Sequence, residues 1–306
     1  MEQAGAHARH SWAPVVRSRT PQMVRHGVPV VGDFSSAMNP SRGFLLERDP
    51  GVTKMAARSL LFAMVALQII PVTVRADEGW DYRLTPYLWF AGLKGDVATI
   101  PGAPTAPIDI SPSQALEDTE AGVMLMFDAK RGRHGVFADF LYTDVQSDEE
   151  LLPPPISLML RSVTKTTIFS LAYQYEIFNQ NQTVIDLLLG ARYWDIDSDL
   201  RFGGGAGLLA GRNVTHDESW IDPLIGAKGR MQLGSSKFYI DGGAGLGGFG
   251  IGSDLFYELY GGIGYQLTNA IGTSIGYRMF DVDYEDSGFV YDARQQGWQL
   301  GLSWAF

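Results

Sequence analysis

The side chains most suited to catalysis lie around one histidine, His216. It is followed in the sequence by Asp217, Glu218 and Ser219. A histidine beside carboxylates and a hydroxyl is a minimal set for general-base and nucleophilic catalysis. A histidine exposed in a loop is far commoner than a catalytic one. Catalysis at His216 is therefore one hypothesis, and the sequence as a whole favours a protein that is not an enzyme.

A second set of functional side chains consists of single charges that alternate with small residues. Arg192, Lys228 and Arg278 each lie two residues from a glycine on the polar parity of a segment. The alternate positions of these segments, which form the apolar parity, carry almost no charge. A narrow lumen filled by ion-paired side chains explains this mixture. The residues predicted to line such a lumen are Asp128, Lys130, Asp139, Asp186, Arg192, Asp222, Lys228, Arg230, Asp241, Glu258, Arg278 and Arg294. They could form either a narrow polar pore or a closed ionic plug, and the small space inside about ten strands favours the plug.

Two acidic groups lie in predicted loops. One contains Asp144, Asp148, Glu149 and Glu150, and the other contains Asp281, Asp283, Glu285 and Asp286. Carboxylates ligate hard cations, which could bridge lipopolysaccharide, but a solvated acidic rim is the simpler reading. Neither group has the spacing of a calcium-binding loop, and the chain has no cysteine. We predict no metal site and no cofactor.

The element that orients these charges is clearest at 297–306. Trp298, Leu300, Leu302, Trp304 and Phe306 share one parity, and small or polar residues occupy the other. A period of two indicates a β-strand with two different faces. In a soluble sandwich the apolar face would cover a core, whereas in an outer-membrane barrel it faces lipid. The charges confined to the polar parity favour the barrel.

About ten segments of this kind follow one another from residue 80 onward, each near the roughly 9–11 residues of a tilted transmembrane strand. We predict strands over 82–94, 122–131, 135–145, 163–177, 183–195, 219–232, 237–246, 255–267, 271–282 and 291–306. Long connections, such as 96–119, 146–160 and 197–217, alternate with short ones, as in bacterial barrels with short periplasmic turns. The predicted fold is all-β: a closed antiparallel up-and-down transmembrane β-barrel of about ten strands, with eight or twelve as alternatives. The aromatic residues Trp89, Tyr193, Trp194 and Trp220 are expected near its outer membrane interface.

The residues before the barrel have a different character. Residues 55–76 contain Arg58, an apolar run of about 12 residues, the helix breaker Pro71 and small residues before position 77, which is the pattern of a secretory signal peptide. Residues 1–54 show no periodicity, and we expect a disordered or non-native upstream extension. Residues 1–76 hold nine of the 24 Lys and Arg residues but only four of the 34 acids. Residues 77–306 therefore carry 15 basic and 30 acidic residues, a formal charge of −15, which argues against nucleic acid as a partner.

The segment 77–306 resembles a family of small, porin-like bacterial outer-membrane β-barrels. The resemblance rests on short motifs that include Leu84-Thr85-Pro86-Tyr87-Leu88-Trp89, Gly190-Ala191-Arg192-Tyr193-Trp194, Trp220-Ile221-Asp222-Pro223, Gly276-Tyr277-Arg278 and the final Phe306. It implies a location in the bacterial outer membrane, among its lipid and lipopolysaccharide. It also implies that Trp304 and Phe306 form a signal read by the barrel-assembly machinery.

Three functions remain open from the sequence. The first is a narrow pore for small solutes with a charged lumen. The second is a structural or surface-interaction barrel with a plugged lumen. The third, which the residues favour least, is an enzyme at the outer rim that uses His216.

Overall fold

A computed structural model describes residues 79–101, 104–152, 158–204 and 211–306 of the chain. The predicted upstream extension, 1–54, and the predicted signal peptide, 55–76, lie outside these ranges.

Almost all of the described chain is β-strand. The elements are β1 (Asp81–Ala98), β2 (Ala106–Ile110), α2 (Pro112–Asp118), β3 (Thr119–Arg131), β4 (His134–Leu152), β5 (Leu158–Gln180), β6 (Thr183–Gly204), β7 (Asn213–Gln232), β8 (Phe238–Gly248), β9 (Leu255–Gln266), β10 (Ile271–Asp286) and β11 (Phe289–Ala305). Within the described ranges, no helix is long and apolar enough to cross a membrane.

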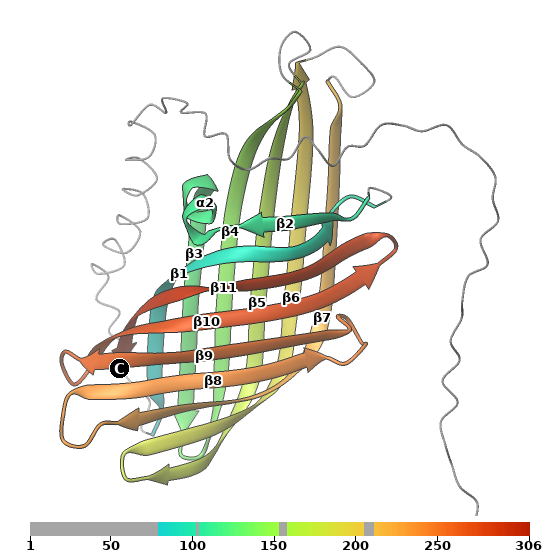
Figure 1. Cartoon of the computed structure of the whole chain (residues 1–306). Helices are drawn as coiled ribbons and strands as arrows, with labels where there is room; N and C mark the ends of the chain where they lie inside the picture. Colours follow the sequence, from blue (N-terminus) through green and yellow to red (C-terminus); the bar gives the residue numbers. More distant parts are fainter. Residues whose placement is uncertain (1–78, 102–103, 153–157, 205–210) are drawn as a thin grey trace, which may run out of the picture. The chain divides into compact units, whose positions relative to one another are not determined.

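The sheet closes on itself. Each strand from β3 to β10 pairs antiparallel with the next in sequence, and β1 pairs with β3 on one side and β11 on the other (Figure 1). Ten strands, β1 and β3–β11, therefore make a closed antiparallel barrel, and β2 is one further strand beside β1. This confirms the predicted fold and strand number.

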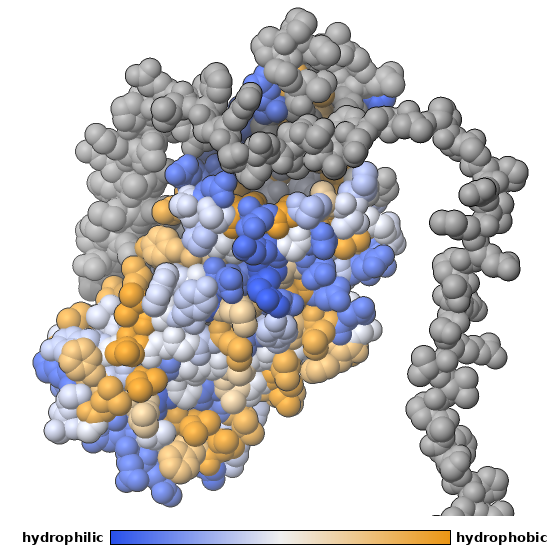
Figure 2. All heavy atoms as spheres, viewed as in Figure 1, coloured by the Kyte–Doolittle hydropathy of each residue, from blue (hydrophilic) through white to orange (hydrophobic). Residues whose placement is uncertain are grey.

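The two parities of each strand face different surroundings, as β5 shows. Phe169, Leu171 and Tyr173 are exposed on the outside, while Ser170 and Gln174 on the alternate parity are buried inside. Apolar side chains outside and polar ones inside is the pattern of a barrel that crosses a bilayer. On the face drawn in Figure 2, apolar side chains gather over the lower part of the barrel, and a hydrophilic group lies above them. We refer to these outward apolar side chains as the apolar belt.

The short connections lie together at one end, where β1 begins and β11 ends. Residues Gly132, Asn181 and Gly234 in three of these turns have positive φ values of 59°, 51° and 59°, which tight hairpins require. At the same end, the backbone N–H of Phe306 donates to the carbonyl oxygen of Tyr82 at 3.0 Å. In this class of barrel the short turns face the periplasm, so the opposite end faces outward.

At the outer end β4 to β7 are longer than predicted and continue beyond the level at which β8 and β9 end (Figure 1). Much of the predicted loops 146–160 and 197–217 is therefore strand, and those loop predictions were wrong in extent. The strands keep their alternation, but their outward residues become polar, as at Asp195 and Asp197, because both faces have left the membrane. We call these four extensions the outer sheet. Its β7 edge has no β8 partner beyond Leu224, which pairs with Gly247.

The predicted long loop 96–119 also contains structure. Residues Leu93 and Val97 of β1 pair with Ile110 and Ala106 of β2. Helix α2 follows, with Ser111 as its N-cap in a reciprocal capping box with Gln114. The strand has 5 residues and the helix 7, and both are too short for the period-two criterion to detect.

Candidate functional site

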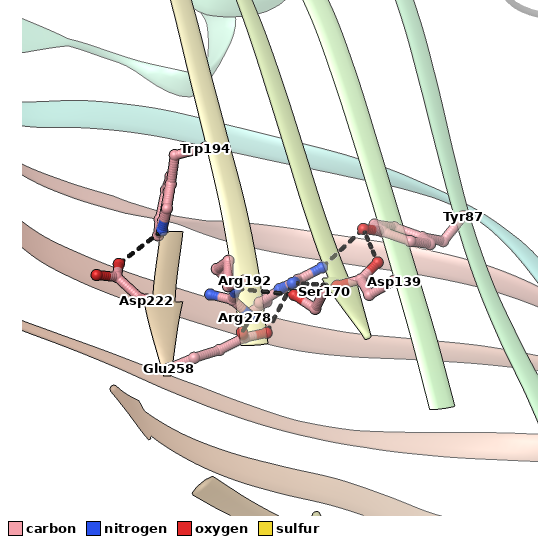
Figure 3. A network of polar contacts seen from close by, with 8 residues as sticks. All are labelled: Tyr87, Asp139, Ser170, Arg192, Trp194, Asp222, Glu258 and Arg278. Atoms are coloured by element: carbon pink, nitrogen blue, oxygen red, sulfur yellow. Dashed lines mark hydrogen bonds and ion pairs between the residues drawn. The ribbon is translucent and has the colours of Figure 1, made fainter. Parts of the chain in front are cut away.

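The inside of the barrel is crossed by a layer of ion pairs centred on Arg278 of β10 (Figure 3). The Arg278 side chain is 3% exposed, and its Nη2 lies 2.6 Å from Asp139 Oδ2 on β4 and 2.7 Å from Glu258 Oε1 on β9. Arg278 Nη1 donates to the hydroxyl of Tyr87 on β1 at 2.8 Å, and this hydroxyl donates to Asp139 Oδ1 at 2.8 Å. The three partners hold the guanidinium in the middle of the lumen.

A second arginine, Arg192 of β6, completes this layer. It pairs with Glu258 and donates from Nε to Ser170 Oγ on β5 at 2.8 Å. Two arginines and two carboxylates balance in charge, and six strands contribute to the layer, which we call the ionic layer. Charge-assisted hydrogen bonds are among the strongest in proteins, so these contacts tie opposite walls of the barrel together.

Above the ionic layer, Asp222 organises the entry to the outer half of the lumen. This fully buried carboxylate accepts hydrogen bonds from Trp194 Nε1 at 2.8 Å and from Ser253 N and Oγ at 2.6 and 2.8 Å. A Cβ at Gly252 would lie 2.5 Å from Asp222 Oδ1, so only glycine allows the β8–β9 loop to approach this closely. Asp222 thus fixes both the loop and an inward tryptophan.

Aromatic rings fill the outer half of the lumen. Trp220 stacks on Tyr284 with ring centroids 3.9 Å apart and on Trp194 at 5.5 Å. Phe280 contacts Trp194 at 5.7 Å and Trp89 at 5.2 Å. These rings, with Phe256, Phe289 and Tyr291, are buried, and we call them the aromatic seal.

The aromatic seal corrects one prediction. Trp89, Trp194 and Trp220 were expected near the outer membrane interface, but they are 7%, 1% and 6% exposed inside the barrel. Their parity could have shown this, since Trp194 shares a strand face with Arg192. Tyr193 alone of the four faces outward, with 37% of its surface exposed.

Below the ionic layer, the lumen widens into a cavity of about 1110 Å³, which we call the periplasmic chamber. Gly132, Gln182, Ser235 and Asn269 from the four short turns line its mouth. Arg192 and Glu258 of the ionic layer line its inner end. The chamber is therefore reached from the turn end of the barrel.

The chamber walls carry several ion pairs. Lys130 Nζ lies 2.8 Å from Glu176 Oε2 and 2.7 Å from Asp186 Oδ1. Beside them, Lys228 of β7, the cross-strand neighbour of Asp186, pairs with Asp128 of β3. Arg230 lies over the ring of Tyr239, 3.5 Å from its centroid, and donates to Gln266 Oε1 at 2.7 Å.

The structure brings most of the predicted lumen residues together. Those that line the chamber are Asp128, Lys130, Asp139, Asp186, Arg192, Lys228, Arg230, Asp241 and Glu258. Arg278 and Asp222 lie buried above it. Arg294 is the exception: it lies on the outward parity of β11, 49% exposed, and pairs with Asp281 at 2.6 Å. Beyond the apolar belt the outward face is polar, so the charge of Arg294 does not indicate that it faces the lumen.

The predicted rim site is divided between two faces of β7. His216 and Glu218 share the inward parity, with His216 Nε2 3.2 Å from Glu218 Oε2. Asp217 and Ser219 have the opposite parity and are exposed, so the hydroxyl does not face the imidazole. Glu218 instead accepts a hydrogen bond from Tyr284 at 2.8 Å, and burial raises the pKa of this Tyr284 hydroxyl, with Glu218 adding to the shift. The pair thus joins the top of the aromatic seal.

Carboxylates are crowded on the outer wall just beyond the apolar belt. Partial burial raises the pKa of Asp195, and the nearby Asp197 and Asp217 raise it further. Burial likewise raises the pKa of Asp283, with Asp292 as the next cause. In the part of the chain that is described, no group of three or more His, Cys, Asp or Glu side chains could hold a metal ion.

The C-terminal aromatic residues contact the start of β1. The ring of Phe306 stacks on Tyr82 with centroids 5.6 Å apart and lies 4.9 Å from Trp304. These three residues therefore join the first and last strands at the periplasmic end.

Comparison with known proteins bears on the fold alone. No protein-family model matches the sequence, and no curated protein matches it. Among solved structures, the outer membrane protease OmpT from Escherichia coli is similar at a TM-score of 0.52 and 11% identity, over 74% of this chain and 97% of OmpT. The attachment invasion locus protein Ail of Yersinia pestis also matches, at a TM-score of 0.33 and 12% identity, over 75% of this chain and 100% of Ail. The closed strand topology, the apolar belt and the likeness to OmpT show that this chain has the fold of a bacterial outer-membrane β-barrel.

Proposed function

We propose that this protein is a non-conducting outer-membrane barrel that acts through its surface rather than as a pore. The observation that carries the proposal is the double closure above the periplasmic chamber. A solute would have to break the pairs of Arg278 with Asp139 and Glu258 and then displace the stacked rings of Trp220 and Tyr284. Separating charges that are this buried is costly, which supports the plugged lumen over the narrow pore.

The outer sheet is the part of the barrel that would carry the surface role. It continues beyond the apolar belt on β4 to β7, and its outward face presents acidic residues such as Asp195 and Asp197. The apolar belt supports contact with membrane lipid. The acidic residues support contact with lipopolysaccharide through bridging divalent cations. The charge of −15 argues against nucleic acid.

A rim enzyme is supported less well. The imidazole of His216 faces Glu218 and the ring of Phe289, whereas Ser219 faces the other side of the strand. We therefore propose that His216→Ala leaves the turnover of lipid and peptide substrates unchanged. Loss of such a turnover in this variant would establish the enzyme instead.

Single-channel recording in planar bilayers tests the closure. The full chain, refolded and inserted, should give no openings at any voltage. Trp220→Ala and Tyr284→Ala combined with Arg278→Ala remove side chains from both closures, and this variant should produce openings or leak, because the surrounding strands cannot collapse inward. Trp298→Ala is a matched control, since this tryptophan is 58% exposed on the outer wall. Discrete openings of the unmodified protein would refute the proposal.

A further inference from the structure

The periplasmic chamber is not explained by a sealed barrel. Its volume of about 1110 Å³ is comparable to the roughly 300–1,000 Å³ of small-molecule sites. Much of the space exists because Gly226 of β7 and Gly243 and Gly245 of β8 line the chamber without side chains. Larger side chains at these positions would reduce the chamber volume, as the aromatic rings do in the outer half of the lumen.

The chamber contains a cation without an ion-pair partner. Arg83 of β1 lines it, within electrostatic range of Lys228 and Arg230 from the opposite strand β7. Lys228 is paired with Asp128, and Arg230 donates to Gln266 and lies over Tyr239. No described residue forms an ion pair with Arg83. The carboxylate of Asp241 on β8 also lies within electrostatic range of Arg83 and Arg230, but among the described residues it forms no ion pair with either. An anion bound at Arg83 would supply the ion-pair partner that this cation lacks.

The chamber also contains an acceptor that lacks a donor. Gln299 of β11 lines it with only 3% of its surface exposed, and its Oε1 has no hydrogen-bond partner among the described residues. A buried acceptor left unpaired costs about 1–3 kcal/mol. The carboxylates of Glu176 on β5 and Asp186 on β6, across the barrel from β11, are further acceptors and already pair with Lys130. A ligand that suits the chamber has an anionic group for Arg83 and N–H or O–H donors elsewhere.

We propose that the periplasmic chamber binds a small organic carboxylate that also carries hydrogen-bond donors, such as a sugar acid or an amino acid. Its carboxylate pairs with Arg83, and its hydroxyl or ammonium groups donate to Gln299 and the wall carboxylates. It enters through the mouth formed by the short turns. This goes beyond the proposed surface role and does not depend on it, because binding and conductance are separate measurements.

Calorimetric titration of the refolded full chain in detergent micelles tests the proposal. D-glucuronate and L-glutamate are the probes for the two sources of this chemistry. Acetate supplies the carboxylate without donors, and glucose supplies the donors without a charge. We expect at least one probe to bind, and both control compounds to bind at least tenfold more weakly than that probe. No heat from either probe up to 10 mM, or acetate binding as tightly as the better probe, would overturn the proposal.

Variants locate the binding. Arg83→Gln should weaken the probe at least tenfold, whereas Arg294→Gln removes the same charge from the outer wall and should leave the affinity within twofold. Heat-dependent gel migration shows whether each variant has folded. Should Arg83→Gln not fold, the unmodified protein still provides a test, because its affinity must fall when salt screens the pairing. Equal affinity in Arg83→Gln, or a salt-independent affinity, would show that Arg83 does not hold the ligand.

Discussion

The sharpest prediction concerns Arg278→Ala. The substitution removes a side chain that is 3% exposed and that contacts Asp139, Glu258 and Tyr87. The two carboxylates would then share Arg192 as the one remaining cation of the ionic layer. Breaking a buried ion pair by removing one partner costs about 3–5 kcal/mol, and we expect a loss in that range.

The control for this prediction is Arg294→Ala. Arg294 also pairs with a carboxylate at 2.6 Å, but its side chain is 49% exposed. Exposed pairs contribute about 0–1 kcal/mol, so this variant should remain close to the unmodified protein. The comparison holds the residue type and the shortest pairing distance constant, while burial and the number of carboxylate partners, two for Arg278 and one for Arg294, differ.

The free energy of unfolding would be measured by urea titration of the refolded protein in detergent, followed by heat-dependent gel migration and tryptophan fluorescence. A second variant, Arg278→Met with Asp139→Asn, removes one charge of each sign. We expect it to recover at least half of the loss, because the Arg192–Glu258 pair remains balanced. The reasoning is wrong if Arg278→Ala costs no more than Arg294→Ala, or if the double variant is no more stable than the single one.

Three further predictions concern closure, charge and assembly. A Cβ at Gly297 would lie 1.8 Å from the carbonyl oxygen of Phe90, so Gly297→Ala should prevent the heat-dependent gel shift of the closed barrel. Gly261→Ala is the control, because a Cβ at Gly261 meets nothing within 4 Å, and this variant should keep the gel shift. The pKa of Asp195 is raised in the folded protein, so its ionisation destabilises the fold above that pKa. Asp195→Asn should therefore raise the unfolding free energy at pH 7 by under about 1 kcal/mol. This gain should disappear as the pH falls through the folded-state pKa, and a gain that persists in acid would refute the assignment. Phe306→Ala should lower the amount of barrel assembled in cells while leaving refolding in detergent nearly unchanged; equal assembly would show that the C-terminal signal lies elsewhere.

The sequence was informative wherever the two faces of a strand meet different surroundings. Between the turns and the apolar belt, one face meets lipid and the other a charged interior, so the alternation gave the barrel strands and placed Arg192 and Arg278 correctly inside. Beyond the belt the outward face is polar, whereas the inward face carries buried apolar side chains such as Phe289 and Tyr291, so the same rule is inverted. This is why the outer ends of β4 to β7 were predicted as loops and why Arg294 was assigned to the lumen.

The contents of the lumen were harder to predict, because they depend on which strands face one another. Parity places Arg278 inside but does not reveal which carboxylates it meets. Its partners come from two other strands: Asp139 is more than 100 residues away in the sequence, and Glu258 is 20 residues away. Aromatic residues add a second ambiguity, since tryptophan is common both at membrane interfaces and in packed cores. Parity, rather than residue type, should have decided the position of Trp194 and Trp220.

Size complementarity explains why the two halves of the lumen differ. In the outer half, a Cβ at Gly247 would lie 2.1 Å from the ring of Phe256, so this glycine makes room for an aromatic side chain on the next strand. In the inner half, Gly243 and Gly245 on the same strand line the chamber without side chains, and a Cβ there would lie 3.2 Å from the carbonyl oxygen of Ala227 and 3.3 Å from Leu224 Cδ1, respectively. One strand therefore uses the same residue type to admit a ring at one end and to leave a cavity at the other. Since the wall is fixed by hydrogen bonds around the whole barrel, neither the removal of a ring nor an unfilled chamber can be healed by collapse. The seal and the chamber are thus set by side chains alone, and single substitutions can change one without the other.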